Sequence, residues 1–167
     1  MTTTCPKSHF TPVETAKLLI KDITFTEDDH TLEPCKADHA WWDIIPSGTK
    51  DWAEIDQGRD LFTYEFTRRF SKCIANPPYR TNHIEACDRK NIFIPFVFRC
   101  LELCDGECWV LLNAKMWSSI TPVRLKKIKD MGFGVSFLRV LSIKEWYGRY
   151  YWVCFKKGSS ATAVIHF

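Results

Sequence analysis

The spacing of apolar residues divides the chain into expected strands and expected helices. Short apolar runs bounded by turn residues indicate strands, and the most continuous run, Trp109 to Leu112, is typical of a strand that is covered on both faces. Strands are predicted at residues 30–34, 51–55, 72–75, 108–113, 134–143 and 150–155, the last two joined as a hairpin by residues 144–149.

Apolar residues at a helical spacing predict helices between these strands. Thr11-Pro12 suits a helix start because proline is accepted in the first turn, and Pro95 has the same place in a later helix. Lysines and arginines between apolar residues predict an amphipathic helix that ends at Gly132. Helices are predicted from residue 12 onward and at residues 40–45, 92–103 and 122–131, after a loose polar lead-in at residues 1–9.

Strands that alternate with helices predict an α/β fold with a mostly parallel sheet and a C-terminal antiparallel hairpin. A length of 167 residues suits one domain with a sizeable core, and no linker or internal repeat suggests a second. In such sheets ligands bind at the carboxyl ends of the strands. Glu33, Glu54 and Asn76 each follow a predicted strand. We therefore expect these three residues to meet at one edge.

Composition and charge exclude few function classes. A content of 46% hydrophobic and 14% aromatic residues is that of a globular protein. The net charge of +3 neither requires nor excludes a polyanionic partner. No apolar stretch approaches the roughly 20 residues of a membrane span, so no membrane partner is predicted.

The eight cysteines are expected to be reduced thiols, because the chain opens without a secretory signal pattern and is long enough to fold without disulfides. This predicts an intracellular, reducing location, either cytoplasm or nucleus. Cys100, Cys104 and Cys108 recur at a spacing of four, but Cys108 lies beyond a turn predicted at Asp105-Gly106. Zinc sites usually show paired short spacings, so buried free thiols are the favoured interpretation and no metal site is predicted.

The tetrapeptide Asn76-Pro77-Pro78-Tyr79 is the strongest chemical motif. The Asn76 amide oxygen and the Pro77 carbonyl are two acceptors that can take both hydrogens of a planar amino group. Proline restricts the backbone, so these carbonyls keep their direction, and Tyr79 offers a face on which a base or an amide can stack. An ordinary loop turn is the other interpretation of the same residues.

Segments in a fixed order resemble the class I S-adenosylmethionine-dependent amino-methyltransferases of the DNA adenine type. The matching segments are Phe10-Thr11-Pro12, residues 32–40, Glu54-Ile55, residues 58–62, Asn76-Pro77-Pro78-Tyr79 and residues 148–155. Asn-Pro-Pro-Tyr is the catalytic signature of that family. The resemblance covers nearly the whole chain and implies a single Rossmann-like methyltransferase domain over residues 1–167.

The resemblance also implies the roles of individual residues. Asn76, Pro77, Pro78 and Tyr79 are the implied catalytic residues, which would align the target nitrogen with the sulfonium methyl of S-adenosylmethionine. The implied cofactor-binding residues are Phe10, Thr11, Pro12, Glu33, Ala37, His39, Glu54, Ile55, Asp60, Leu61, Phe62 and Asn76.

Three acids have distinct implied tasks at the cofactor. Glu54 would accept hydrogen bonds from the ribose hydroxyls, Asp60 would accept one from the adenine amino group, and Glu33 would order the amino-acid end. Phe62 or Ile55 would pack on the adenine ring. As alternatives, Asp60 also suits a solvated surface, and Phe10 and Phe62 suit the core.

Two functions stay open at this point. The first is methyl transfer to an exocyclic amino nitrogen, foremost adenine N6 of DNA, with RNA adenine and a protein amide as lesser options. The second is a catalytically inactive binding or regulatory subunit without the cofactor, because Ala37 and His39 stand where the family pattern has glycines that let the backbone approach the ligand.

A nucleic acid is the expected partner, DNA before RNA. The chain has no separate target-recognition domain, so recognition is expected to need loops such as residues 80–90, a second copy of the chain or a partner subunit. The candidate phosphate contacts are Arg68, Arg69, Lys72, Arg80, Arg89, Lys90, Lys126, Lys127, Lys129 and Arg149.

Overall fold

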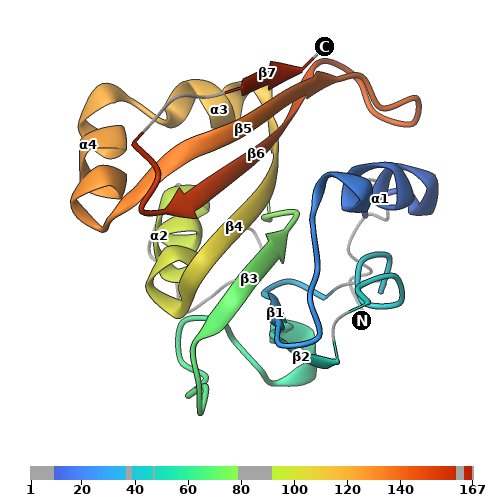
Figure 1. Ribbon diagram of the computed structural model, residues 1–167. Helices are drawn as coiled ribbons and strands as arrows, with labels where there is room; N and C mark the ends of the chain where they lie inside the picture. Colours follow the sequence, from blue (N-terminus) through green and yellow to red (C-terminus); the bar gives the residue numbers. More distant parts are fainter. Residues whose placement is uncertain (1–9, 37–38, 47, 79–91, 161–163, 167) are drawn as a thin grey trace, which may run out of the picture.

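The computed structural model describes residues 10–36, 39–46, 48–78, 92–160 and 164–166. Seven strands form one sheet in the order β2-β1-β3-β4-β6-β5-β7 (Figure 1). The strands are β1 (His30–Glu33), β2 (Thr49–Trp52), β3 (Phe70–Ala75), β4 (Cys104–Asn113), β5 (Phe133–Leu141), β6 (Tyr150–Lys157) and β7 (Val164–His166).

The first four strands run parallel, and β6 lies antiparallel between β4 and β5. β7, which the sequence did not predict, pairs parallel with β5. The predicted α/β class, the mostly parallel sheet and the C-terminal hairpin are therefore confirmed.

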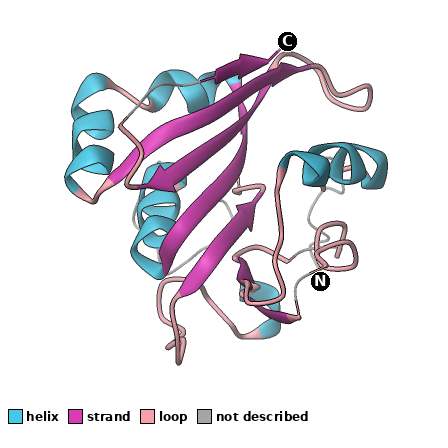
Figure 2. Ribbon diagram, viewed as in Figure 1, coloured by secondary structure: helices cyan, strands magenta, loops and turns pink. Residues whose placement is uncertain are grey.

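Helices flank the sheet on both faces. They are α1 (Val13–Leu19), η2 (Ile20–Asp22), η3 (Ile55–Gln57), α2 (Phe93–Leu103), α3 (Ala114–Ser119) and α4 (Pro122–Asp130). Gly132, with φ of +86°, follows the C-terminus of α4 as predicted. The helix predicted at residues 40–45 is wrong. This segment is a loop whose bonds from Ile44 and Ile45 to the Trp41 carbonyl close one turn only (Figure 2).

Two of the strands differ most from the prediction. The edge strand β2 ends at Trp52, and residues 55–57 form the turn η3 instead of continuing it. β4 begins at Cys104, so the turn predicted at Gly106 is wrong. A Cβ at Gly106 would lie 2.2 Å from the Ser71 carbonyl oxygen, and glycine is needed there for the close approach of β3.

Alternate residues of the central strands face two hydrophobic clusters. On one face, Cys108, Val110 and Leu112 of β4 pack with α2, α3 and α4. On the other face, Trp109 and Leu111 pack with α1 and the loop around Trp41. Figure 1 shows α2 and α4 on the opposite side of the sheet from α1. Burial on both faces explains the continuous apolar run of β4.

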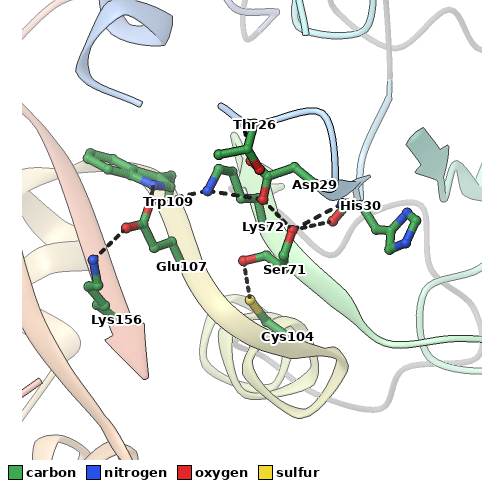
Figure 3. A network of polar contacts seen from close by, with 9 residues as sticks. All are labelled: Thr26, Asp29, His30, Ser71, Lys72, Cys104, Glu107, Trp109 and Lys156. Carbon is green, nitrogen blue, oxygen red and sulfur yellow. Dashed lines mark hydrogen bonds and ion pairs between the residues drawn. The ribbon is translucent and has the colours of Figure 1, made fainter. Parts of the chain in front are cut away.

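A polar network joins β1, β3 and β4 at their amino ends (Figure 3). Lys72 lies 3.3 Å from the Asp29 carboxylate and 3.8 Å from that of Glu107. Asp29 also accepts hydrogen bonds of 2.7 Å from the Ser71 hydroxyl and the Thr26 backbone amide. The side chains of Lys72 and Asp29 are buried, so each charge depends on its partners there.

The network continues onto the antiparallel half of the sheet. Lys156 of β6 donates to Glu107 at 2.9 Å, and the Trp109 indole nitrogen donates to the same carboxylate at 3.1 Å. Four adjacent strands are thereby linked at the edge where β1, β3 and β4 begin and the antiparallel β6 ends. Among the described helices, none is long and apolar enough to cross a bilayer.

Candidate functional site

The loops that follow β1, β2 and β3 are joined at the carboxyl edge of the sheet. The Ala53 amide donates to the Glu33 carbonyl at 2.9 Å, and the Lys36 amide donates to the Ala53 carbonyl at 3.0 Å. The Cys35 thiol donates to the Asn76 carbonyl at 3.0 Å. These bonds bring Glu33, Ala53 and Asn76 to one place, as the strand ends predicted.

The pKa of the Cys35 thiol depends on the charges at this edge of the sheet. Burial raises its pKa well above the ordinary value, and the negative charges of Glu33 and Glu54 raise it further. The Asn76 carbonyl has a smaller, opposite effect. Cys35 therefore stays a neutral donor, and the edge around it is acidic.

Glu33 and Glu54 differ in their surroundings. Glu33 is the last residue of β1, and only 1% of its surface is exposed. Glu54 is half-buried, and its carboxylate accepts a 3.4 Å bond from the Asp56 amide at the start of η3. Its neighbour Ile55 is 41% exposed, although it is apolar. An exposed isoleucine next to an acid is available for contact with a ligand ring.

Residues 58–62 form a tight turn beside Glu54. Glu54 pairs with Arg59 through an isolated antiparallel bridge, and Gly58 takes the left-handed conformation with φ of +74°. The Asp60 carboxylate accepts from the Phe62 amide at 3.0 Å, so this side chain shapes its own turn. Leu61 is buried in the core.

Phe62 is partly buried against the core, in accord with the packing alternative. A fully solvated Asp60, the other alternative, does not match a side chain that is half-buried. The contact of Asp60, Leu61 and Phe62 with an adenine ring stays a prediction.

His39 has a left-handed backbone, with φ of +70°, and is the one non-glycine residue with positive φ among the described residues. Glycine tolerates this conformation, whereas a side chain adds strain. The loop therefore keeps the backbone shape of a glycine position although the residue is histidine. Ala37, the other departure, lies outside the described residues.

Layers of cations and aromatic rings line the edge strand next to the site. The Lys36 ammonium lies 4.6 Å from the ring centroids of both Trp42 and Trp52. The Arg59 guanidinium lies 4.3 Å from the Trp52 ring and 4.1 Å from that of Tyr64. Such contacts stabilise a cation in place of water, so the charge of Lys36 is held between indole faces.

Local sequence pattern does not predict these layers, because their members are separated along the chain between residues 36 and 64. A lysine and an arginine near three aromatic residues could have been noted. Their stacking depends on the β1–β2 pairing, which places Glu33 opposite Trp52.

The segment Phe10-Thr11-Pro12 lies against the same face as Trp41. The Trp41 indole nitrogen donates to the Thr11 hydroxyl at 3.1 Å, and both residues are buried. Trp41 stacks on Trp152 at 5.2 Å, while its neighbour Trp42 is half-exposed. Phe10 is 37% exposed, so it is not a core residue. Pro12 precedes the first turn of α1 as predicted.

The Asn-Pro-Pro turn begins directly after β3. Asn76 is half-buried and its carbonyl is fixed by Cys35, while Pro77 is buried and Pro78 half-buried. Tyr79 lies outside the described residues, as do Arg80, Arg89 and Lys90. The amide of Asn76 is thus carried by a buried strand and two prolines, which restrict its position.

The described cysteines are free thiols, and most are buried in the core. Burial raises the pKa of Cys100 well above its ordinary value. Cys100 lies in the last turn of α2, whereas Cys104 and Cys108 lie on β4. The three thiols are therefore not on one helix. Within the ranges that the structure describes, no group of three acidic, cysteine or histidine side chains could hold a metal ion.

Several of the predicted phosphate contacts are engaged elsewhere. Lys72 is buried in the amino-end network, so its prediction as a phosphate contact is wrong. Arg69 pairs with Asp105 at 2.6 Å, and Lys126 pairs with Asp130 at 2.9 Å. Arg149 is exposed at the carboxyl edge, where it can meet a ligand.

Several solved structures with similar folds are described as methyltransferases. A structure described as a class I S-adenosylmethionine-dependent methyltransferase from Listeria monocytogenes matches with a TM-score of 0.64 and 14% identity, covering 98% of this chain and 68% of that one. One described as an RNA methyltransferase from Pyrococcus horikoshii matches with a TM-score of 0.64 and 17% identity, covering 92% and 91%.

The M protein of the type I restriction enzyme EcoKI is a third similar structure. It matches with a TM-score of 0.61 and 12% identity, over 91% of this chain but only 44% of its own length. No family model and no curated protein matches the sequence. The chain has the Rossmann-like methyltransferase fold, as predicted from the sequence. At these identities the similarity establishes the fold alone.

Proposed function

We propose that the protein transfers a methyl group from S-adenosylmethionine to an exocyclic amino nitrogen, foremost adenine N6 of DNA. The observation that carries this proposal is the meeting of Glu33, Glu54 and the Asn76 turn at the carboxyl edge of a methyltransferase-type sheet. The similarity to a type I restriction enzyme M protein supports a nucleic acid substrate.

The residues of this edge fit the cofactor. S-adenosylmethionine supplies an electrophilic methyl group on a cationic sulfonium. The negative charges of Glu33 and Glu54, which raise the pKa of Cys35, suit a cationic ligand. The positive charge of Lys36 is held by contacts with the Trp42 and Trp52 rings. Glu54 would hold the ribose hydroxyls, exposed Ile55 would pack on the adenine ring with Phe62, and Glu33 would order the amino-acid end.

Asn76 and Pro77 would hold the target amino group with their two oxygens. Stacking of Tyr79 on the base is what the resemblance implies. The bound cofactor would supply the methyl group and leave as its thioether, and the target nitrogen would release a proton to solvent. Alignment and exclusion of water are the contributions of the protein, because the amino group needs no strong base when its lone pair faces the methyl. Duplex DNA would have to expose the base by flipping, which costs about a few kcal/mol.

Recognition of a target sequence is assigned to another chain, either a second copy or a partner subunit. The chain spans 44% of the length of the EcoKI M protein, and its described residues form the methyltransferase-type sheet with flanking helices. A noncatalytic subunit is the alternative, favoured by His39 in a glycine conformation.

Calorimetric titration with S-adenosylmethionine, and then with its demethylated product, tests the proposal. We expect binding, and transfer of labelled methyl to DNA that falls by about 10²-fold or more in Asn76→Ala. Asn113→Ala is the matched control. This asparagine ends the neighbouring strand and caps α3 at 2.8 Å, so its loss lowers stability by about 1 kcal/mol and leaves transfer intact. No heat at millimolar ligand would exclude an autonomous enzyme and favour the noncatalytic subunit.

A further inference from the structure

The turn between β5 and β6, residues 142–149, carries a tyrosine whose side chain is fully exposed. Tyr147 has a relative exposure of 103%, the highest among the exposed large hydrophobic residues that the structure describes. A ring in this position buries no area in the fold and adds nothing to its hydrophobic stability. A single exposed aromatic residue is common on protein surfaces, so the case for Tyr147 depends on its position and on its charged neighbours.

Buried neighbours hold the backbone that carries Tyr147 in place. Ile143 and Tyr150, at the two ends of the turn, are buried in the second core cluster. Trp146 packs on the Tyr150 ring at 4.9 Å, and the Tyr150 hydroxyl donates to the Tyr147 carbonyl at 3.3 Å. Gly148, with φ of +99°, allows the chain to reverse. The ring is therefore presented on a supported turn.

This turn lies at the same edge as the Asn76 turn. Ala75 pairs with Val110 of β4, and Tyr150 pairs with Asn113 at the carboxyl end of that strand. The Ala114 amide donates to the Arg149 carbonyl at 3.1 Å and ties the turn to the start of α3. One strand, β4, separates the two turns, and Figure 1 shows the β5–β6 turn projecting beyond the sheet.

Basic residues surround the exposed ring. Lys144 and Arg149 are exposed on either side of it along the chain, and Glu145 is the acid between them. On the nearby α1, Lys17 is already paired with Glu14 at 2.8 Å. The two cations next to Tyr147 along the chain are therefore Lys144 and Arg149 of the turn itself.

We propose that Tyr147 stacks on an unpaired base of the nucleic acid substrate, with Lys144 and Arg149 on the adjoining phosphates. The inference rests on the proposed function, because it takes a base to be held at Asn76. A base that leaves its stack uncovers the face of its neighbour, and an aromatic ring can cover that face. A protein partner would require a broader apolar core than a single ring between cations.

Fluorescence anisotropy with a labelled single-stranded oligonucleotide tests the stacking. Tyr147→Ala is expected to bind roughly ten- to one-hundred-fold more weakly, the usual effect of losing one base–aromatic stack. Tyr147→Phe keeps the ring and should stay within about twofold of the original chain. Leu125→Ala, an exposed apolar residue of α4 on another side of the molecule, is the control and should not change the affinity.

Salt dependence tests the phosphate contacts. Two phosphates neutralised on a single strand contribute about 1.4 to the slope of log affinity against log salt, and the double change Lys144→Gln and Arg149→Gln should remove that contribution. An unchanged slope overturns the assignment of these two residues.

Cofactor titration separates this inference from the proposed function. Tyr147→Ala should bind S-adenosylmethionine as the original chain does, because Glu33 ends β1 and Glu54 caps η3, so neither belongs to the β5–β6 turn. If the original chain binds oligonucleotide through Tyr147 but no cofactor, the methyltransferase proposal fails and the stacking proposal stands. Equal oligonucleotide affinity with tyrosine and alanine, an equal loss with phenylalanine, or no binding by the original chain overturns the stacking proposal.

Discussion

The amino and carboxyl ends of the parallel strands hold similar residue types in different ways. At the amino ends, Lys72 of β3 pairs directly with Asp29, just before β1, and with Glu107 of β4. At the carboxyl ends, backbone bonds and the Cys35 thiol join the loops that carry Glu33 and Asn76. Paired buried charges are costly to disturb, whereas side chains on loops fixed through their backbones can exchange partners. We infer that the amino end secures the sheet and the carboxyl end serves a ligand.

Removing the cation of the amino-end network should produce the largest effect on stability. Lys72→Met leaves Asp29 and Glu107 close together without the charge between them, and we expect the unfolding free energy to fall by about 3 to 5 kcal/mol. Equilibrium urea unfolding measures this change. The affinity for S-adenosylmethionine, measured below the unfolding transition, should not change.

Lys156→Met is the matched control for that prediction. Lys156 pairs with Glu107 at 2.9 Å but is half-exposed, so its loss should lower stability by about 1 kcal/mol or less. Equal losses from Lys72→Met and Lys156→Met would show that burial of the pair has no special weight at this end.

The close approach of β3 and β4 gives the second largest effect. In Gly106→Ala the new Cβ would meet the Ser71 carbonyl oxygen at 2.2 Å, so the strands must shift, and we expect a loss of about 2 to 3 kcal/mol. Gly48→Ala, where the nearest atom lies at 3.7 Å, should differ from the original chain by less than about 0.5 kcal/mol. Thermal or urea unfolding compares the two variants. A neutral Gly106→Ala would mean that the strands are further apart there.

Acid should weaken the amino end selectively. Burial alone raises the pKa of Asp29, but bonds from Ser71 and Thr26 and the charge of Lys72 outweigh it and leave that pKa lowered. For Glu107, burial is likewise outweighed, by Lys156, Trp109 and Lys72. A lowered pKa in the folded state stabilises the fold above the ordinary values of 3.8 and 4.5, and this stabilisation is lost as pH falls below them.

Urea unfolding at a series of pH values checks the direction of that effect. The unfolding free energy of the original chain should fall between about pH 5 and pH 3, and that of Asp29→Asn should fall less because one of the two carboxylates is absent. Parallel curves for the two chains would show that Asp29 titrates as it does in the unfolded state.

The sequence predicted those parts of this comparison that depend on short-range pattern. The apolar run at Trp109 correctly predicts the buried strand β4. The Asn76 turn and the acids after two strands lie at the predicted edge, because strand ends are marked by local residue type. Lys72 was mistaken for a phosphate contact, since its partners Asp29 and Glu107 are distant in the chain.

Two further features are not predictable from local sequence, because they also depend on distant residues. The turn expected at Gly106 is wrong, since glycine is required there by the Ser71 carbonyl on the neighbouring strand. The helix expected at residues 40–45 is a loop in which Trp41 packs on Trp152, a contact between distant segments that overrides local helical pattern.

The smallest predicted effect concerns the carboxyl end and has the opposite sign. His39→Gly removes a side chain from a residue with φ of +70°, and we expect the unfolding free energy to rise by about 1 kcal/mol. His30→Gly is the matched control, because His30 has the extended backbone of β1 and its replacement should lower stability by about 1 kcal/mol. Urea unfolding of both variants shows whether the sign depends on backbone conformation.

Titration of His39→Gly with S-adenosylmethionine then tells whether the strain serves the ligand. If the imidazole occupies space that the cofactor needs, the glycine variant should bind more tightly as well as unfold less readily, and histidine would be a barrier to binding. If the affinity falls while stability rises, the imidazole contacts the cofactor, and the strain at His39 is retained because it places that ring in the site.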